Sequence, residues 1–247
     1  MKALLRIAMT RARAIAVAMG LSVVAGAAPA LAGQQVYTYT IIHPIYGEIG
    51  TFTDTIDRSR EATRIDSRLR VAVTLLGIVV YRQESDITEI MRGNRLVSLQ
   101  SVTEKDGLHV EVHGEAQGDQ FLVDATAGSF AGPATIAPSD PWVLKRTGDG
   151  TVVFTDTGRI INVHISGGDY DTISVNGVSV SARHFVVMGD KRQDVWLDNQ
   201  AMPIMFRVVE KGTPIDFVLQ NATAEAGAIS VASVKPAAFA GLGNGGK

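Results

Sequence analysis

No cysteine occurs among the 247 residues, which excludes a disulfide framework, a thiolate nucleophile and a thiolate metal site. A surplus of one charge is also missing, because 23 basic and 25 acidic residues leave a formal net charge of −2. Nucleic-acid-binding domains carry a clustered basic excess, so we expect no nucleic-acid partner. The serine-hydrolase elbow, zinc-protease and phosphate-loop motifs are absent, and the glycine run from Gly241 lacks the strand and helix of a dinucleotide site. We therefore expect no cofactor, no metal site and no catalytic residue of these classes.

Residues 1–32 have the three-part pattern of a signal peptide. The first 13 residues carry four cations and no acid, and residues 14–27 are uncharged and apolar. This run is shorter than the roughly 20 residues of a membrane-spanning helix. Ala30-Leu31-Ala32 then forms an A-x-A site before Gly33. We expect cleavage after residue 32 and a periplasmic or secreted protein without a transmembrane segment after cleavage; an uncleaved N-terminal anchor is the alternative.

Cleavage changes the size and charge of the chain. Removal of 32 of 247 residues leaves 215, and the loss of four cations moves the formal net charge from −2 to −6. Burial of roughly 70% of the surface of the unfolded chain is expected at this length, so a core can replace disulfides. The composition predicts one domain over residues 33–221 and a flexible Ala/Gly-rich tail over residues 222–247.

Short β-branched or aromatic runs alternate with glycine-centred turn signals from Val36 to Leu219. Asn-Gly and Asp-Gly suit two-residue hairpin turns, which need positive φ at both central residues. The pattern predicts an all-β domain, a single antiparallel meander of about ten to twelve strands that forms a half-barrel or barrel. The turn signals are Tyr46-Gly47, Leu76-Gly77, Gly93-Asn94, Asp106-Gly107, Gly118-Asp119, Asp149-Gly150, Gly167-Gly168, Asn176-Gly177, Gly189-Asp190 and Lys211-Gly212.

One segment, Ser139-Asp140-Pro141-Trp142, predicts a short helix. Ser and Asp are capping residues, and the fixed φ of proline suits the first helical turn. Such a turn would carry Trp142 over one open end of the curved sheet.

Strand parity separates one-sided from two-sided strands. From Arg64 to Val73, charged residues alternate with apolar ones, so this strand has one wet and one buried face. Residues 202–206 are apolar on both parities and must be covered on both faces. The short helix, a second sheet layer, the tail, a partner and a lipidic ligand are all candidates for the second cover.

Four runs occur in an order that resembles a known family. They are Ile45 to Phe52, Val79-Val80-Tyr81 leading to Glu84, Arg183 to Gly189, and Asp194 to Asp198. Together they resemble a bacterial exported family catalogued as domain of unknown function 6134, over residues 34 to 220. The chain is also similar to uncharacterised periplasmic β proteins that share a curved antiparallel sheet with lipoprotein carriers. The resemblance implies an exported half-barrel or barrel, without an assigned activity or catalytic residue.

A cluster of histidines and glutamates includes His109, Glu111 and His113 on one strand face. Zinc ligands converge to about 2.0–2.2 Å from one ion, whereas a single strand holds His109 and His113 about 13 Å apart. The spacing favours a solvated polar face over a metal site.

His184 projects from an otherwise apolar strand face, so its ring needs a polar partner. It is either a core histidine with a carbonyl or carboxylate partner, or a polar group in a mostly apolar ligand pocket. Arg183 shares the opposite face with Phe185.

Charged residues line the two strands on either side of Leu76-Gly77. They predict a surface ladder of cross-strand ion pairs, each worth tenths of a kcal/mol. If this face is concave, they would line a polar cavity instead. The set is Arg64, Asp66, Arg68, Arg70, Arg82, Glu84 and Asp86.

Trp196 lies on the same strand face as Asp194 and Asp198. It is either a packing residue whose indole N–H has a hydrogen-bond partner, or a residue that stacks on a ligand.

The leading hypothesis is a non-catalytic protein that binds an apolar or amphipathic, lipid-like small molecule. Candidate contact residues are His184, Arg183, Trp196, Trp142 and Phe206. The alternatives are an envelope structural or protein-interaction module, and a hydrolase or isomerase that uses His184 with Asp194 or Asp198.

Overall fold

The computed structural model describes residues 33–59, 61–143, 147–224 and 227–229. The expected signal peptide and most of the expected tail lie outside these residues. The elements are β1 (Gln34–His43), β2 (Gly47–Arg58), β3 (Thr63–Leu75), β4 (Ile78–Arg92), β5 (Arg95–Lys105), β6 (Leu108–Gln117), β7 (Gln120–Ala125), β8 (Gly128–Pro133), β9 (Ala137–Pro138), the 3₁₀ helix η1 (Pro141–Val143), β10 (Gly148–Val153), β11 (Ile160–Val175), β12 (Val178–Met188), β13 (Arg192–Leu197), β14 (Pro203–Glu210), β15 (Thr213–Ala224) and β16 (Gly227–Ile229).

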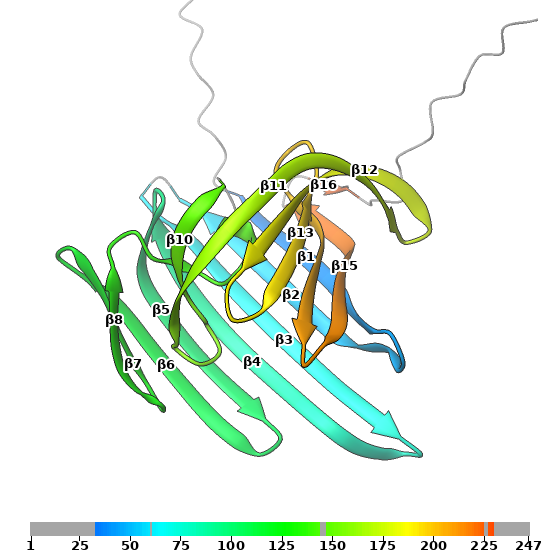
Figure 1. Ribbon diagram of the computed structural model, residues 1–247, viewed down its shortest axis with the longest axis horizontal. Coiled ribbons are helices and arrows are strands. Elements are labelled where there is room, and N and C mark those ends of the chain that lie inside the picture. The colour runs from blue at the N-terminus through cyan, green and yellow to red at the C-terminus, as the bar shows by residue number, and fades with distance from the viewer. Residues whose placement is uncertain (1–32, 60, 144–146, 225–226, 230–247) are drawn as a thin grey trace, which may run out of the picture. The chain divides into compact units, whose positions relative to one another are not determined.

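The strands form one sheet in the order β8-β7-β6-β5-β4-β3-β2-β1-β15-β14-β13-β12-β11-β10-β9, and β16 pairs with β15. Neighbouring strands are antiparallel except for β9 and β10. The sheet curves so that β10–β15 lie in front of β1–β8 (Figure 1). The β10–β11 turn meets the opposite layer, where Gly158 lies against Val112, Val123 and Ala125. The expected all-β, barrel-like antiparallel fold is confirmed.

The number of strands is higher than the expected ten to twelve. The β7–β8 hairpin turns at Thr126-Ala127, which carries no glycine signal, and β9 and β16 are too short to show a pattern. Two expected turns are instead parts of strands, because Asp149-Gly150 lies within β10 and Gly167-Gly168 within β11. Strand β15 continues to Ala224, past the expected start of the tail.

Four of the expected two-residue turns have the predicted geometry. Leu76, Asp106, Asn176 and Lys211 have φ of 51°, 48°, 52° and 49°, and each is followed by a glycine with positive φ. Positive φ at both central residues matches the right-handed twist of the flanking strands. These four signals therefore set the register of their hairpins.

The expected short helix is present as η1. The carboxyl Oδ1 of Asp140 accepts the backbone N–H of Trp142 at 3.0 Å, as a capping residue does. Within the described part of the chain, no helix is long and apolar enough to cross a membrane.

The second face of the two-sided strands is covered by the chain itself. A β-bulge at Gly167-Gly168 bends the β11–β12 hairpin, and Figure 1 shows this hairpin arching over β13. Its turn is tied to β15, because Asn176 Nδ2 donates to the carbonyl of Leu219 at 2.9 Å. Val175 and Ala182 of the hairpin are buried, as is Met205 of β14. The folded-back hairpin thus covers part of the second face of β13 and β15.

Candidate functional site

Polar side chains occupy part of the interior of the curved sheet. In the sheet register, Asp54 of β2 is opposite Tyr37 of β1 on one side and Ser67 of β3 on the other. Glu89 of β4 projects into the same interior. Asp54 is 0% exposed and Glu89 1%, and Ser67 is buried beside them. The η1 segment adds Asp140, which is also buried. We name Asp54, Glu89 and Asp140 the interior carboxyl cluster.

Neutral groups donate hydrogen bonds to two members of the interior carboxyl cluster, Asp54 and Asp140, and the backbone N–H of Trp142 is the donor to Asp140. Asp54 accepts hydrogen bonds from the hydroxyl of Ser67 and from the indole Nε1–H of Trp142. The Trp142 ring lies 4.6 Å from the Tyr37 ring, measured between centroids. Trp142 is only partly buried, whereas Asp54 behind it is fully buried. Trp142 therefore caps the cluster on the side that faces solvent.

Burial raises the pKa of every member of the cluster. Desolvation raises the pKa of Asp54 to about 7, although hydrogen bonds from Ser67 and Trp142 oppose the shift. Desolvation and the nearby charge of Asp54 raise the pKa of Glu89 to about 8. The pKa of Asp140 is raised well above its usual value by burial and by the charges of Asp54 and Glu89. Near neutral pH the cluster therefore holds protons and can both donate and accept hydrogen bonds.

Among the residues that the structure describes, two buried polar atoms in or next to the cluster have no hydrogen-bond partner. They are Oε2 of Glu89 and Oγ of Ser101, a neighbouring inward-facing residue of β5. Unpaired buried polar atoms cost free energy and often mark the position of a water molecule or ligand group. These two atoms show where an added polar group would be stabilised.

An aromatic cluster continues the interior beside these carboxyl groups. The Phe206 ring stacks on Phe217 at 4.3 Å and lies 5.4 Å from Tyr39 and 5.9 Å from Phe52. The hydroxyl of Tyr39 donates to the carbonyl of Pro203 at 2.9 Å. The interior thus combines an apolar aromatic wall with a few convergent polar groups, as small-molecule sites do.

The alternation of residues along β2 and β4 already places two of these acids on apolar strand faces. Asp54 lies between Phe52 and Ile56 on one parity of β2, and Glu89 lies between Ile87 and Met91 on β4. A carboxyl group on an apolar strand face predicts a buried acid. The sequence pattern does not show that the two acids are neighbours, because the pairing of β2, β3 and β4 is what brings them into one cluster.

His184 and Trp196 lie together on the outer face of the sheet. Their rings stack at 4.5 Å with an interplanar angle of 6°. His184 Nε2 lies 2.8 Å from Asp194 Oδ1, and Arg192 donates two hydrogen bonds to the same carboxylate. Burial alone would raise the pKa of Asp194, but the bonds from Arg192 and His184 bring it below its usual value. This carboxylate therefore holds both the Arg192 guanidinium and the His184 ring. The indole N–H of Trp196 donates to Asp171.

The five predicted contact residues fall into separate places. Trp142 and Phe206 belong to the interior, His184 and Trp196 form the outer stack, and Arg183 lies over the Phe185 ring at 5.0 Å. The structure does not bring these residues into one site.

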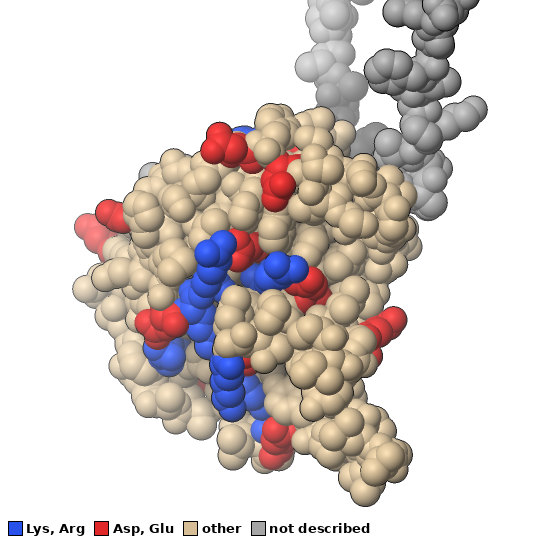
Figure 2. Space-filling model, turned by 45° about the vertical axis from the view of Figure 1, so that its right-hand side comes forward, with Lys and Arg blue, Asp and Glu red and all other residues tan. Residues whose placement is uncertain are grey.

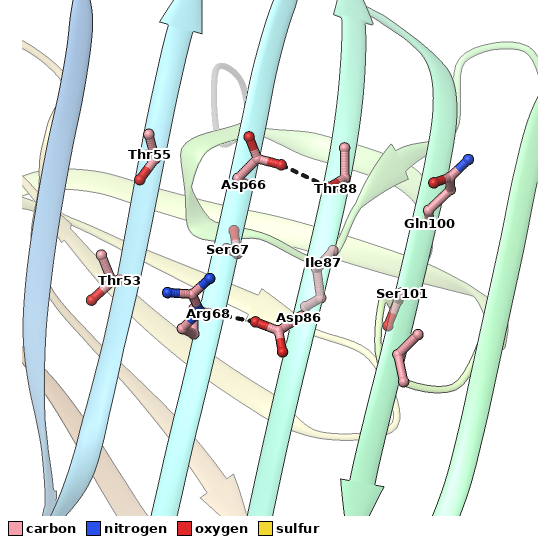
Figure 3. Close-up of a pocket in the computed structure, with 11 residues that line it drawn as sticks. Thr53, Thr55, Asp66, Ser67, Arg68, Asp86, Ile87, Thr88, Gln100 and Ser101 are labelled. Atoms are coloured by element: carbon pink, nitrogen blue, oxygen red, sulfur yellow. Dashed lines mark hydrogen bonds and ion pairs between the residues drawn. The ribbon is translucent and has the colours of Figure 1, made fainter.

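The predicted charged ladder lies on the outer face of β3 and β4. Arg68 donates to Asp86 at 3.0 Å, Arg70 donates to Asp86 at 2.8 Å, and Thr88 donates to Asp66 at 2.7 Å. A hollow of about 520 Å³ lies over this ladder, and Figure 3 shows two of these contacts in it. Figure 2 shows that Lys and Arg side chains on this view of the surface lie next to Asp and Glu side chains. The ladder residues in the hollow satisfy one another, as a surface ladder predicts.

His109 and His113 lie on the exposed face of β6. His109 Nε2 is 2.9 Å from Glu111, and its other ring nitrogen contacts Glu104. These contacts raise the pKa of His109. No group of three or more His, Asp or Glu side chains in the described ranges is arranged to hold a metal ion.

Comparisons with known proteins identify the family of this chain and one solved structure with a similar fold. No curated protein matches the chain at a significant level. The crystal structure of a β-barrel-like protein of domain of unknown function DUF1849 from Brucella abortus aligns with a TM-score of 0.59 and 9% sequence identity, covering 78% of this chain and 98% of that chain. This similarity shows the fold. The family model for DUF6134, a domain of unknown function, matches residues 46–220, and the chain therefore belongs to the DUF6134 family.

Proposed function

We propose that this protein is exported by its N-terminal signal peptide and is a non-catalytic binding protein for an amphipathic, lipid-like small molecule. The polar end of the ligand meets the interior carboxyl cluster, and its apolar part packs against the aromatic cluster around Phe206. One observation carries the proposal. Buried carboxyl groups with raised pKa values lie beside two unpaired polar atoms and an aromatic wall.

Burial of several acids is costly for a fold that needs only a core. Each buried polar group without a full set of partners costs about 1–3 kcal/mol. Groups with strongly shifted pKa values cluster at functional sites for this reason. A head group with hydrogen-bond donors, such as an amine or a hydroxyl, would satisfy Glu89 Oε2 and offset part of this cost.

Binding fits the geometry better than catalysis. A hydrolase must also admit water to its acid, whereas Asp54 and Glu89 are sealed from solvent. The outer pair of His184 and Asp194 is within hydrogen-bond distance, but Asp194 is also held by Arg192, and the hollow over the charged ladder does not include the pair. Large side chains such as Tyr39, Phe121 and Leu99 fill the interior. A ligand therefore enters by displacement of the Trp142 turn.

The chain has two tryptophans, Trp142 at the interior carboxyl cluster and Trp196 in the outer stack, so their fluorescence can report which place binds a probe. Protein purified from a periplasmic extract is extracted with organic solvent, and the extract is examined by mass spectrometry. N-phenyl-1-naphthylamine, an apolar amine with one N–H donor, is then titrated into the protein. Energy transfer from Trp142 is measured in Trp196→Phe, and transfer from Trp196 is measured in Trp142→Phe.

We expect saturable binding with stronger transfer from Trp142 than from Trp196. Glu89→Met removes both carboxyl oxygens and should weaken binding about tenfold, the effect of one lost hydrogen bond of about 1.4 kcal/mol. His113→Gln changes an exposed polar residue and is the matched control. Absence of both an extracted molecule and saturable probe binding would refute the proposal, and so would equal weakening by the control.

A further inference from the structure

An uncharged hairpin extends from one end of the sheet. Residues 71–81 contain no charged side chain, and Arg70 and Arg82 bound them. The last pairing of β3 with β2 is Val71 with Gly50, and the last pairing of β4 with β5 is Gln83 with Lys105. Beyond these pairs, β3 and β4 continue as a two-stranded ribbon, about 16 Å long at 3.3 Å per residue.

The end of this ribbon is apolar and exposed on both faces. We name residues 74–80 the hairpin tip. Leu75 and Ile78 are 42% and 68% exposed on one face, and Val79 is 56% exposed on the other. Leu76, at the turn itself, is fully exposed at 103%. Figure 2 shows a projection without charged side chains at its lower right, where Figure 1 places this hairpin.

Neighbouring turns at the same end of the sheet carry exposed apolar side chains as well. In an antiparallel meander, the β1–β2, β3–β4 and β5–β6 turns lie at one end. The first carries Ile45 and Tyr46, exposed at 78% and 45%, and the third carries Leu108 at 69%. Exposed apolar groups that gather in this way mark an interaction surface.

We infer that the hairpin tip inserts into the surface of a lipid bilayer, with the Ile45-Tyr46 and Leu108 turns in contact with the same surface. The shape of the tip selects this occupant. A groove on a protein covers one face of a ribbon, whereas a bilayer surrounds both faces, both edges and the apex. Three neighbouring turns that each expose apolar side chains also meet a broad surface more readily than a pocket.

The length and flanks of the tip fit an interfacial position. Three residues on each strand reach about 10 Å, comparable to the roughly 5–10 Å depth of apolar groups at the boundary of headgroups and acyl chains. Tyr81 follows the tip and is an amphipathic residue of the type enriched at membrane interfaces. Arg70 and Arg82 then lie at the level of the headgroups.

The absence of native cysteine makes the test site-specific. Leu76→Cys takes a single nitrobenzoxadiazole label, and Val178→Cys labels the β11–β12 turn as the matched control, because Val178 is also exposed, at 48%. Each labelled full-length protein is mixed with vesicles of phosphatidylethanolamine and phosphatidylglycerol. We expect emission at position 76 to rise severalfold with a blue shift, and emission at position 178 to stay unchanged.

A second measurement separates insertion from other contacts. Vesicle flotation is compared for wild type, Leu76→Asp and Val178→Asp, with thermal unfolding as the check on folding. All three chains share the same N-terminus, so their differences report the tip. We expect Leu76→Asp to lower the floated fraction at least fivefold and Val178→Asp to leave it unchanged. Unchanged emission at position 76, or a dimer in light scattering that Leu76→Asp dissociates without any vesicle binding, would overturn the inference.

Discussion

The indole N–H of Trp142 donates a hydrogen bond to the buried carboxyl group of Asp54, 88 residues earlier in the chain. This bond joins the η1 segment to β2, on the side of the sheet that faces the interior. Its partners are an aromatic side chain that is partly exposed and an acid that is fully buried. The bond thus ties the η1 segment to β2 at a buried position.

Trp142→Phe removes that bond while it retains most of the ring packing against Tyr37. We expect a loss of about 1–3 kcal/mol in the free energy of unfolding, because Asp54 loses a donor in a buried position. Urea unfolding measures the loss. The same substitution in an Asp54→Val background, which has no acceptor for the indole N–H, should cost less, and equal losses in both backgrounds would show that the bond contributes nothing.

Stability should fall as pH rises from about 4 to about 8. Asp54 and Glu89 have folded-state pKa values of about 7 and about 8, above their ordinary values of 3.8 and 4.5. The folded state therefore keeps protons that the unfolded chain releases, so stability present below about pH 4 is lost as pH passes through the folded-state values. Carboxylates with lowered pKa values, such as Asp86, act in the opposite direction at lower pH.

Urea midpoints at about pH 5 and about pH 8 test this dependence, with Glu89→Gln as the decisive comparison. His109 has a raised pKa and contributes a change of the same sign, so the wild-type slope alone does not identify the cluster. We expect Glu89→Gln to flatten the slope. A slope equal to that of the wild type would contradict the assignment to Glu89.

Asn176 has two separable contributions to the folded-back hairpin. Its φ of 52° suits the turn, and its side chain bonds to Leu219 and Gln220. Asn176→Gly keeps the turn and removes the tie, whereas Asn176→Ala removes both and adds about 1–2 kcal/mol of left-handed strain. Amide hydrogen exchange in β11 and β12 should therefore be faster in Asn176→Gly than in the wild type, and faster still in Asn176→Ala. Strands β3 and β4 serve as the internal reference. Unchanged exchange in both variants would show that the tie does not hold the hairpin.

The outer ladder should contribute little to stability. Asp86 accepts bonds from Arg68 and Arg70, but its side chain is 57% exposed. Exposed ion pairs contribute about 0–1 kcal/mol and are screened by salt. Asp86→Asn should therefore shift the free energy of unfolding by less than about 1 kcal/mol, and less still at high salt. A loss above about 2 kcal/mol would mean that this face has a structural role that exposed pairs do not explain.

Local chemistry made part of the fold predictable. Asn176-Gly177 and Asp106-Gly107 specify turns because positive φ is easy for those residues, and the Asp140-Pro141 pair specifies a helix start. Gly167-Gly168 was misread as a turn because two glycines also permit a bulge. Only the pairing of β11 with β12 distinguishes the two outcomes.

The interior cluster could be predicted less well than the fold. Asp54 and Glu89 are separated by 35 positions and belong to different strands, and their proximity follows from sheet register rather than from sequence spacing. His184 is a candidate contact residue by sequence because it lies on an apolar strand face, yet its partners lie on the outer face of the sheet. Parity assigns a face to each residue, but it does not say which face encloses the interior.

The pairing of β1 with β15 has a consequence for folding. Tyr39 pairs with Leu219 and Ile41 with Phe217, so the middle of the sheet joins segments from opposite ends of the described chain. Contacts of such high sequence separation slow folding, because loop closure must precede them. During synthesis β1 is complete before β15 has been made, so the edge of β1 that pairs with β15 stays unpaired until then. A chain cut short before Thr213 would lose its central seam rather than its rim, and its exposed edge would favour aggregation.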